Sequence, residues 1–98
     1  MVYEIIFKKR FRNKLEKVFL YLENEFGYLV AKKFASILDK KFKTLSEYPL
    51  IGQPSTLFPQ IRSFIAGKNR IYYRIENEKI IVINMYDMRI NPKRNKYK

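Results

Sequence analysis

The chain has 98 residues, of which 21 are Lys or Arg and nine are Asp or Glu, giving a formal net charge of +12. It contains no Cys and no His, which excludes a disulfide scaffold, thiolate zinc sites and histidine catalysis. A hydrophobic content of 47% suffices for a small core, and the length predicts one domain, residues 1–98. A net positive charge of this size favours nucleic acid, an anionic membrane or an acidic protein as a binding partner. The alternative is a basic protein whose charge only keeps it soluble.

The N-terminal apolar run is too short for a signal peptide, and no apolar stretch reaches 18 residues. We therefore expect no membrane partner and a cytoplasmic location. Residues 2–7 read as a strand, with Tyr3, Ile5 and Phe7 on one face.

Two helices are predicted next. Residues 11–26 carry an apolar stripe at helical spacing, and Gly27 suits the end of a helix. The stripe consists of Phe11, Leu15, Val18, Phe19, Leu22 and Phe26. Residues 28–47 form the second helix, with Val30, Phe34, Ile37, Leu38 and Leu45 on its apolar side. The short break predicts an antiparallel hairpin, and Pro49 stops the second helix.

Residues 48–60 form a loop that we expect to be pinned to the core by apolar side chains, namely Leu50, Ile51, Leu57 and Phe58. Three strands follow, at about 61–66, 70–76 and 79–87, with turns at 66–69 and at Asn77. Alternation places Arg70, Tyr72 and Arg74 on one face of the second of these strands. In the last strand, strict alternation separates Ile81, Ile83 and Met85 from Val82, Asn84 and Tyr86.

The predicted fold is α+β, in the order β-α-α-β-β-β, with the helix hairpin packed on one face of a small, mainly antiparallel sheet. The other sheet face is expected to be wet and basic. Residues 91–98 form a basic C-terminal tail.

Five pieces of sequence in this order resemble the RelE/ParE superfamily of toxins from type II toxin–antitoxin systems, which includes plasmid stabilisation proteins. They are FLYLENEFG, AKKFASIL, LSEYPLIGQP, IRSFIAGKNRIYYRI and IIVINMYDMRINPK. The resemblance covers almost the whole chain. It implies a cognate antitoxin and one of two activities: ribosome-dependent mRNA cleavage, as in RelE-like members, or inhibition of DNA gyrase, as in ParE-like members. Neither implies a metal or a small-molecule cofactor.

The resemblance also suggests residues for each role. Arg70 precedes an apolar-apolar-Tyr run as an arginine does in RelE-like toxins, where a guanidinium could stabilise a phosphate. The candidate catalytic residues are Arg70, Arg89, Lys68 and Tyr86. Those for nucleic-acid binding are Arg62, Arg70, Tyr72, Arg74, Lys93 and Arg94, and Tyr97 is a further candidate tyrosine. Each role has a structural alternative. Arg70 could be an ordinary surface arginine, Arg89 could form an ion pair with Asp87, and the tyrosines could have only a packing role.

One departure weakens the nuclease interpretation. RelE-like toxins carry two lysines on the strand before the arginine, but this chain has Ile61, Arg62 and Ser63 there, and arginine does not readily give up a proton. The sequence leaves both mechanisms open. It also leaves open a non-toxic nucleic-acid-binding module or an inactive toxin retained for autoregulation with its antitoxin.

Overall fold

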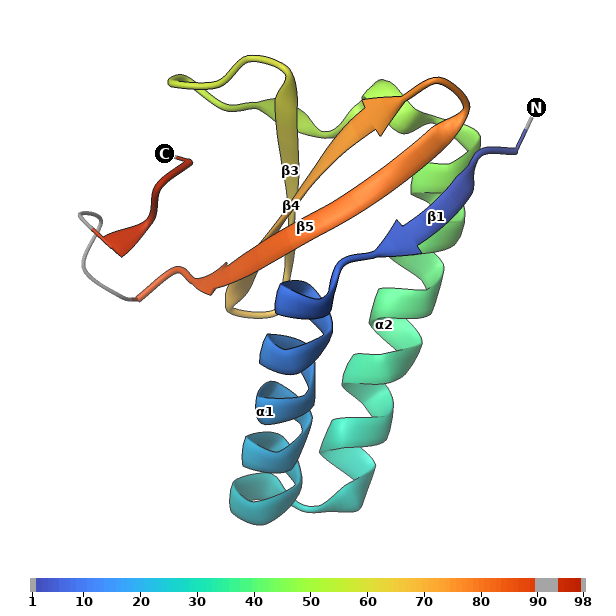
Figure 1. The fold of residues 1–98 in the computed structure, drawn as a ribbon. Coiled ribbons are helices and arrows are strands. Elements are labelled where there is room, and N and C mark those ends of the chain that lie inside the picture. Colours follow the sequence, from blue (N-terminus) through green and yellow to red (C-terminus); the bar gives the residue numbers. More distant parts are fainter. Residues whose placement is uncertain (1, 90–93, 98) are drawn as a thin grey trace.

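The computed structural model describes residues 2–89 and 94–97 (Figure 1). A short strand precedes a helix hairpin, and the remaining strands follow. The elements are β1 (Glu4–Phe7), α1 (Lys9–Phe26), α2 (Tyr28–Glu47), the 3₁₀ turn η1 (Pro49–Ile51), β2 (Gln53–Pro54), β3 (Ile61–Ala66), β4 (Asn69–Glu76) and β5 (Lys79–Asp87). The strands form one sheet in the order β1-β5-β4-β3-β2, in which only β1 and β5 are parallel. The predicted fold class is confirmed, with β2 as a short additional edge strand.

The two helices meet at Gly27, whose φ of 93° favours glycine and whose N–H donates to Glu23 O at 3.0 Å. The tip of the hairpin extends beyond the sheet (Figure 1). Phe26 and Val30 lie near this tip and are 59% and 42% exposed, so the prediction that they belong to the core is wrong. Neither helix in the described part of the chain has the length and apolar character that crossing a membrane requires.

The core lies between the helix hairpin and the sheet. Phe11 of α1 is almost fully buried, with its ring centroid 5.6 Å from that of Phe7 and 6.1 Å from that of Phe42. The other buried residues of the core come from α2 and from the sheet face turned toward the helices. They include Phe34, Leu38, Leu45, Ile71, Tyr73, Ile80, Val82 and Met85. Burial of these apolar side chains is the main force that fixes the sheet on the hairpin.

A β-bulge changes the faces of β5. Tyr73 pairs with Val82 and Tyr72 with Asn84, so Ile83 is an extra residue between two successive pairs. The strict alternation expected for this strand is therefore wrong, because Ile81 and Met85 lie on opposite faces of the sheet. The sequence does not reveal this bulge, because the Ile and Val residues around it could lie on either face of the sheet.

Polar bonds, rather than apolar contacts, hold the 48–60 loop. The expected pins (Leu50, Ile51, Leu57 and Phe58) are all exposed, so that prediction is wrong. Instead, the buried Tyr73 hydroxyl donates to Pro49 O at 2.7 Å and accepts from the Gly52 N–H at 2.9 Å. Burial raises the pKa of Tyr73, which keeps this hydroxyl protonated and able to donate. Arg62 Nη1 adds bonds to Leu50 O at 3.1 Å and Gly52 O at 2.8 Å.

Candidate functional site

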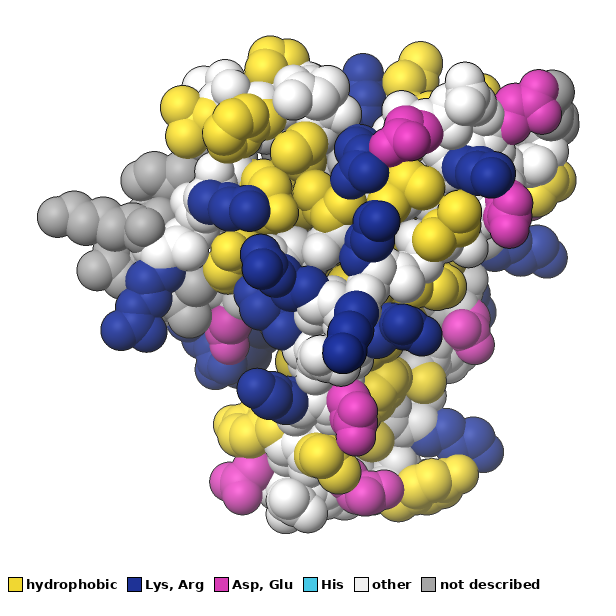
Figure 2. Space-filling model, viewed as in Figure 1, with side chains coloured by type: hydrophobic (Ala, Val, Ile, Leu, Met, Phe, Trp, Pro, Cys, Tyr) yellow, Lys and Arg dark blue, Asp and Glu magenta, His cyan; other side chains and the backbone are white. Residues whose placement is uncertain are grey.

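The sheet face opposite the helices, here called the outer face, carries several of the predicted site residues. Arg70 pairs with Tyr86, and Tyr72 with Asn84, so these four side chains share that face. Figure 2 shows Lys and Arg side chains gathered over the sheet and the start of α1. The outer face therefore combines positive charge with tyrosine rings, as the alternation in β4 predicts.

Three tyrosines form a cluster on this face. The ring centroid of Tyr97 lies 4.6 Å from that of Tyr72 and 6.1 Å from that of Tyr86. Asn95 Nδ2 donates to the Tyr72 hydroxyl at 2.8 Å, and Ser55 Oγ donates to Tyr97 O. Tyr72 is only 3% exposed and Tyr97 only 6%. The expectation of a wet face is thus wrong at Tyr72, because the segment 94–97 folds back over it and leaves its ring no open face.

Lys14 approaches this cluster from α1 and was not predicted. Because β1 pairs with β5 only as far as Val82, α1 can lie along the rest of that strand. Lys14 Nζ donates to Met85 O at 3.1 Å and lies 3.8 Å from the centroid of the Tyr86 ring. Burial lowers the pKa of Lys14, and the charges of Arg10, Lys17 and Lys96 lower it further. In the sequence Lys14 is one of many helix lysines, and only the crossing of α1 over β5 distinguishes it.

Arg70 is half-buried beside the tyrosines. Its Nη1 donates to Ser63 Oγ on the neighbouring strand at 3.0 Å. Within the described part of the chain Arg70 makes no ion pair, so its remaining guanidinium donors can bind an anion. Arg74, also on the outer face, is instead paired with Glu76 at 2.7 Å.

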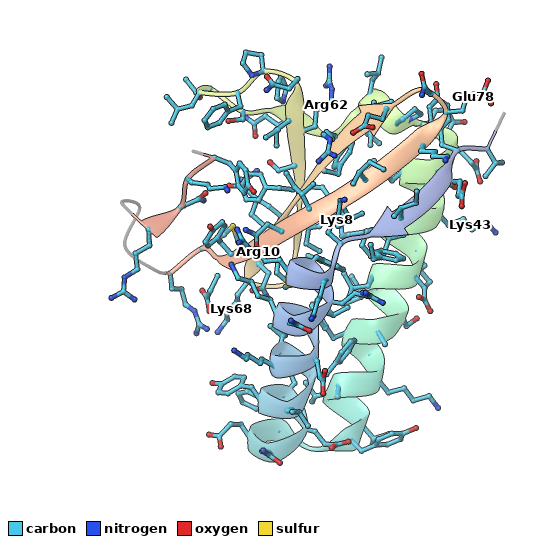
Figure 3. All side chains as sticks on the ribbon, viewed as in Figure 1. Lys8, Arg10, Lys43, Arg62, Lys68 and Glu78 are labelled. Carbon is cyan, nitrogen blue, oxygen red and sulfur yellow. The ribbon has the colours of Figure 1, made fainter. Side chains whose placement is uncertain are left out.

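The remaining predicted site residues have surroundings different from those of Arg70. Arg62 is on the opposite face of β3, bound to the loop carbonyls, and Figure 3 shows it at the far end of the strand from Lys68. Lys68 lies in the β3–β4 turn. Arg89 follows the end of β5 and binds Asp87 through Nε–Oδ1 at 2.9 Å and Nη2–Oδ2 at 2.6 Å. Lys93 lies outside the described residues, and Arg94 is exposed.

The structure therefore brings Arg70, Tyr72 and Tyr86 together on the outer face. Lys68 and Arg89 lie at the same end of the sheet as Arg70, but they line a hollow beside α1 and α2. Among residues 2–89 and 94–97, no three His, Cys, Asp or Glu side chains lie close enough together to hold a metal ion. A site on the outer face would act through charge, hydrogen bonds and aromatic surface.

The Arg89–Asp87 pair makes a prediction for acidic pH. Its hydrogen bonds lower the pKa of Asp87 to about 2 from an ordinary 3.8. Since the folded-state pKa is depressed, the pair's stabilisation is fully present above about pH 4 and is lost as pH falls toward 2. The pair is largely exposed and screened by solvent, so we expect its effect on the free energy of unfolding to be small. NMR titration should give a pKa near 2 for Asp87, returning to its ordinary range in Arg89→Gln. An unchanged pKa in that variant would rule out the pair as its cause.

Comparison with known proteins gives the family. Residues 5–91 match the family described as the ParE toxin of the type II toxin–antitoxin system, parDE. No curated protein sequence matches the chain significantly.

Three solved structures share the fold. A chain of the chromosomal ParDE system from P. aeruginosa has a TM-score of 0.73 at 12% identity, over 88% of this chain and 96% of the other. A chain of the toxin–antitoxin complex RelBE2 from Mycobacterium tuberculosis has a TM-score of 0.63 at 23% identity, and the match covers 89% of this chain and 99% of the other. A double arginine-to-alanine mutant of E. coli toxin RelE in the free state has a TM-score of 0.62 at 19% identity, and the match covers 91% of this chain and 86% of the other. The order of elements, the sheet topology and the family match over residues 5–91 together show that this chain belongs to the ParE toxin family of type II toxin–antitoxin systems, within the RelE/ParE superfamily.

Proposed function

We propose that this protein arrests growth by inhibiting DNA gyrase, in the cytoplasm, and that a cognate antitoxin neutralises it. The family match to ParE toxins and the antitoxin-containing systems among the similar structures support this proposal. Inhibition of this kind needs a surface that binds gyrase, and it does not need catalytic side chains.

The placement of Lys68 and Arg89 off the outer face carries the choice of mechanism. Cleavage of RNA requires a base, an acid and charge stabilisation around one phosphate. Arg70 lies on the outer face, whereas Lys68 and Arg89 line a hollow beside α1 and α2, and Arg89 is engaged by Asp87. No lysine stands at Ile61 to Ser63, so β3 offers no base beside Arg70.

A second candidate is ribosome-dependent, metal-independent mRNA cleavage, and Lys14 is the observation that favours it. A lysine with a lowered pKa, set against Tyr86, is suited to proton transfer. The 2′-hydroxyl, giving up its proton, would attack the adjacent phosphate to form a 2′,3′-cyclic phosphate, and the P–O bond to the next nucleotide would break as its 5′-oxygen takes up a proton. Arg70 would stabilise the charge that develops on the phosphate. Binding of RNA by Tyr72 would first require the segment 94–97 to move away.

A gyrase assay tests the proposal. Purified protein, mixed in stoichiometric excess with DNA gyrase and relaxed plasmid, should reduce supercoiling at least tenfold, and Arg70→Ala should reduce it equally. Full supercoiling in the presence of a protein that still arrests growth would contradict gyrase inhibition. Full supercoiling without growth arrest would favour the non-toxic module or an inactive toxin.

A further inference from the structure

A groove runs along the helix hairpin between α1 and α2. Its volume is about 550 Å³, and only residues of the two helices line it. Leu15 and Phe19 of α1 give it an apolar lining, and the small side chains of Ala31 and Ala35 of α2 leave room beside them. Leu20 at its edge is 52% exposed. A second hollow shares part of this lining and extends the groove toward β1. In the described part of the chain the groove is open to solvent.

Charges of both signs border this groove. Arg12, Glu16 and Glu23 come from α1 and Lys32 comes from α2, and all four side chains are exposed. Among residues 2–89 and 94–97, none of these four forms an ion pair. Their charges are therefore available to a partner that carries both signs in matching positions.

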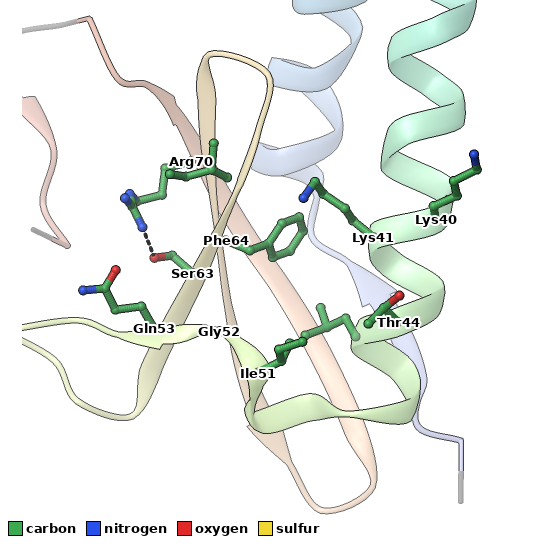
Figure 4. Close-up of a pocket in the computed structure, with 11 residues that line it drawn as sticks. Lys40, Lys41, Thr44, Ile51, Gly52, Gln53, Ser63, Phe64 and Arg70 are labelled. Carbon is green, nitrogen blue, oxygen red and sulfur yellow. Dashed lines mark hydrogen bonds between the residues drawn. The ribbon is translucent and has the colours of Figure 1, made fainter.

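Much of the remaining surface disfavours association of the chain with itself. The net charge is +12, and Lys and Arg side chains gather over the sheet (Figure 2). The hollow beside β3 is bordered by Lys40, Lys41 and Arg70 and by no Asp or Glu, so two copies would repel each other there (Figure 4). Residues 18–31 of the hairpin, in contrast, contain Glu23 and Glu25 and no Lys or Arg. The hairpin is therefore where a second copy meets less repulsion.

The groove side of α1 is complementary to itself when two copies run antiparallel. An α-helix rises about 1.5 Å per residue, so Arg12 and Glu23 lie about 8 Å on either side of a point between residues 17 and 18. Leu15 and Leu20 lie about 4 Å on either side of the same point. A two-fold axis through this point places Arg12 opposite Glu23 of the second copy, and Leu15 opposite Leu20 of the second copy. Each contact occurs twice, because the same patch of both copies makes a two-fold interface.

We propose that the hairpin groove binds α1 of a second copy of this chain, and that the two α1 helices run antiparallel in a symmetric dimer. A helix of another protein could fill the apolar lining, but it would not require charges and leucines of this chain to be spaced evenly about one point. The interface uses one side of one hairpin, so it is small and the dimer should dissociate at low micromolar concentration. No outer-face residue lines the groove, and the inference does not depend on how the protein arrests growth.

Sedimentation equilibrium of the full chain tests the proposal. Between about 5 µM and about 500 µM, the average mass should rise from the 12.0 kDa of one chain toward twice that value. Arg12→Glu places two carboxylates opposite each other at both symmetric positions and should weaken the dimer at least about tenfold. Leu20→Glu, which would bury a carboxylate in the groove, should weaken it by a similar factor. A constant mass of 12.0 kDa over the whole range would overturn the proposal.

Arg12→Glu combined with Glu23→Arg tests the antiparallel register. The double variant exchanges the two charges within one chain, so the pairs form again, and its dissociation constant should lie within about threefold of the original. Lys17→Glu is the matched control, because it makes the same change in charge on α1 but lines the hollow on the other side of the helix. It should leave the dissociation constant within about threefold. A double variant that is folded by circular dichroism but stays as weak as Arg12→Glu, or equal weakening by Lys17→Glu, would overturn this dimer.

Discussion

Replacing Gly52 by alanine is expected to destabilise the fold by about 3 kcal/mol. A Cβ at this position would press on the Tyr73 hydroxyl and would lie 2.7 Å from Tyr73 Cε1 and 2.9 Å from Ser63 O. Tyr73 is fully buried and cannot move aside, so the loop must shift and lose the two hydrogen bonds to its hydroxyl. The free energy of unfolding, from urea titration, measures the effect.

Leu50→Ala is the matched control for Gly52→Ala. Leu50 lies in the same loop but is exposed, so its truncation should change the free energy of unfolding by less than about 0.5 kcal/mol. If Gly52→Ala cost no more than Leu50→Ala, the loop would not be anchored by Tyr73 as described.

Phe11→Ala is expected to cost about 4 kcal/mol. The Phe11 ring is 1% exposed and lies against Phe7 and Phe42, and Phe42 in turn contacts Phe64 of β3. Its loss opens a cavity at the point where α1, α2 and the sheet meet. The measurement is again urea unfolding.

On the same helix, Leu20 is half exposed near the hairpin tip and provides the comparison. Leu20→Ala should stay within about 0.5 kcal/mol of the original chain. A loss below about 2 kcal/mol for Phe11→Ala would mean that the aromatic contacts are not central to the core.

The helices and the three long strands could be predicted because their signals are local. α2 begins and ends at Tyr28 and Glu47 as expected, since Gly27 and Pro49 bound it. β3 and β5 match their expected bounds, and the turns at Gly67 and Asn77 use residues that tolerate their positive φ. Periodicity also placed Phe11, Phe34 and Leu38 correctly in the core.

What could not be predicted depends on tertiary contacts. The bulge at Ile83 arises in the pairing of β4 with β5, and both faces of that strand are apolar. Tyr97 covers Tyr72 because the chain folds back after β5, which no nearby residue signals. The approach of Lys14 to Tyr86 likewise requires α1 to lie along β5. The pairing of Arg89 with Asp87, by contrast, is local and was one of the two alternatives for that residue.

The most direct test of the central claim is the mapping of mRNA 5′ ends across the transcriptome shortly after this protein is induced in a bacterium. An inhibitor of gyrase should arrest growth without new ends inside translated codons, and Arg70→Ala should arrest growth as well. New ends inside codons that disappear in Arg70→Ala would contradict the account and show a ribosome-dependent ribonuclease.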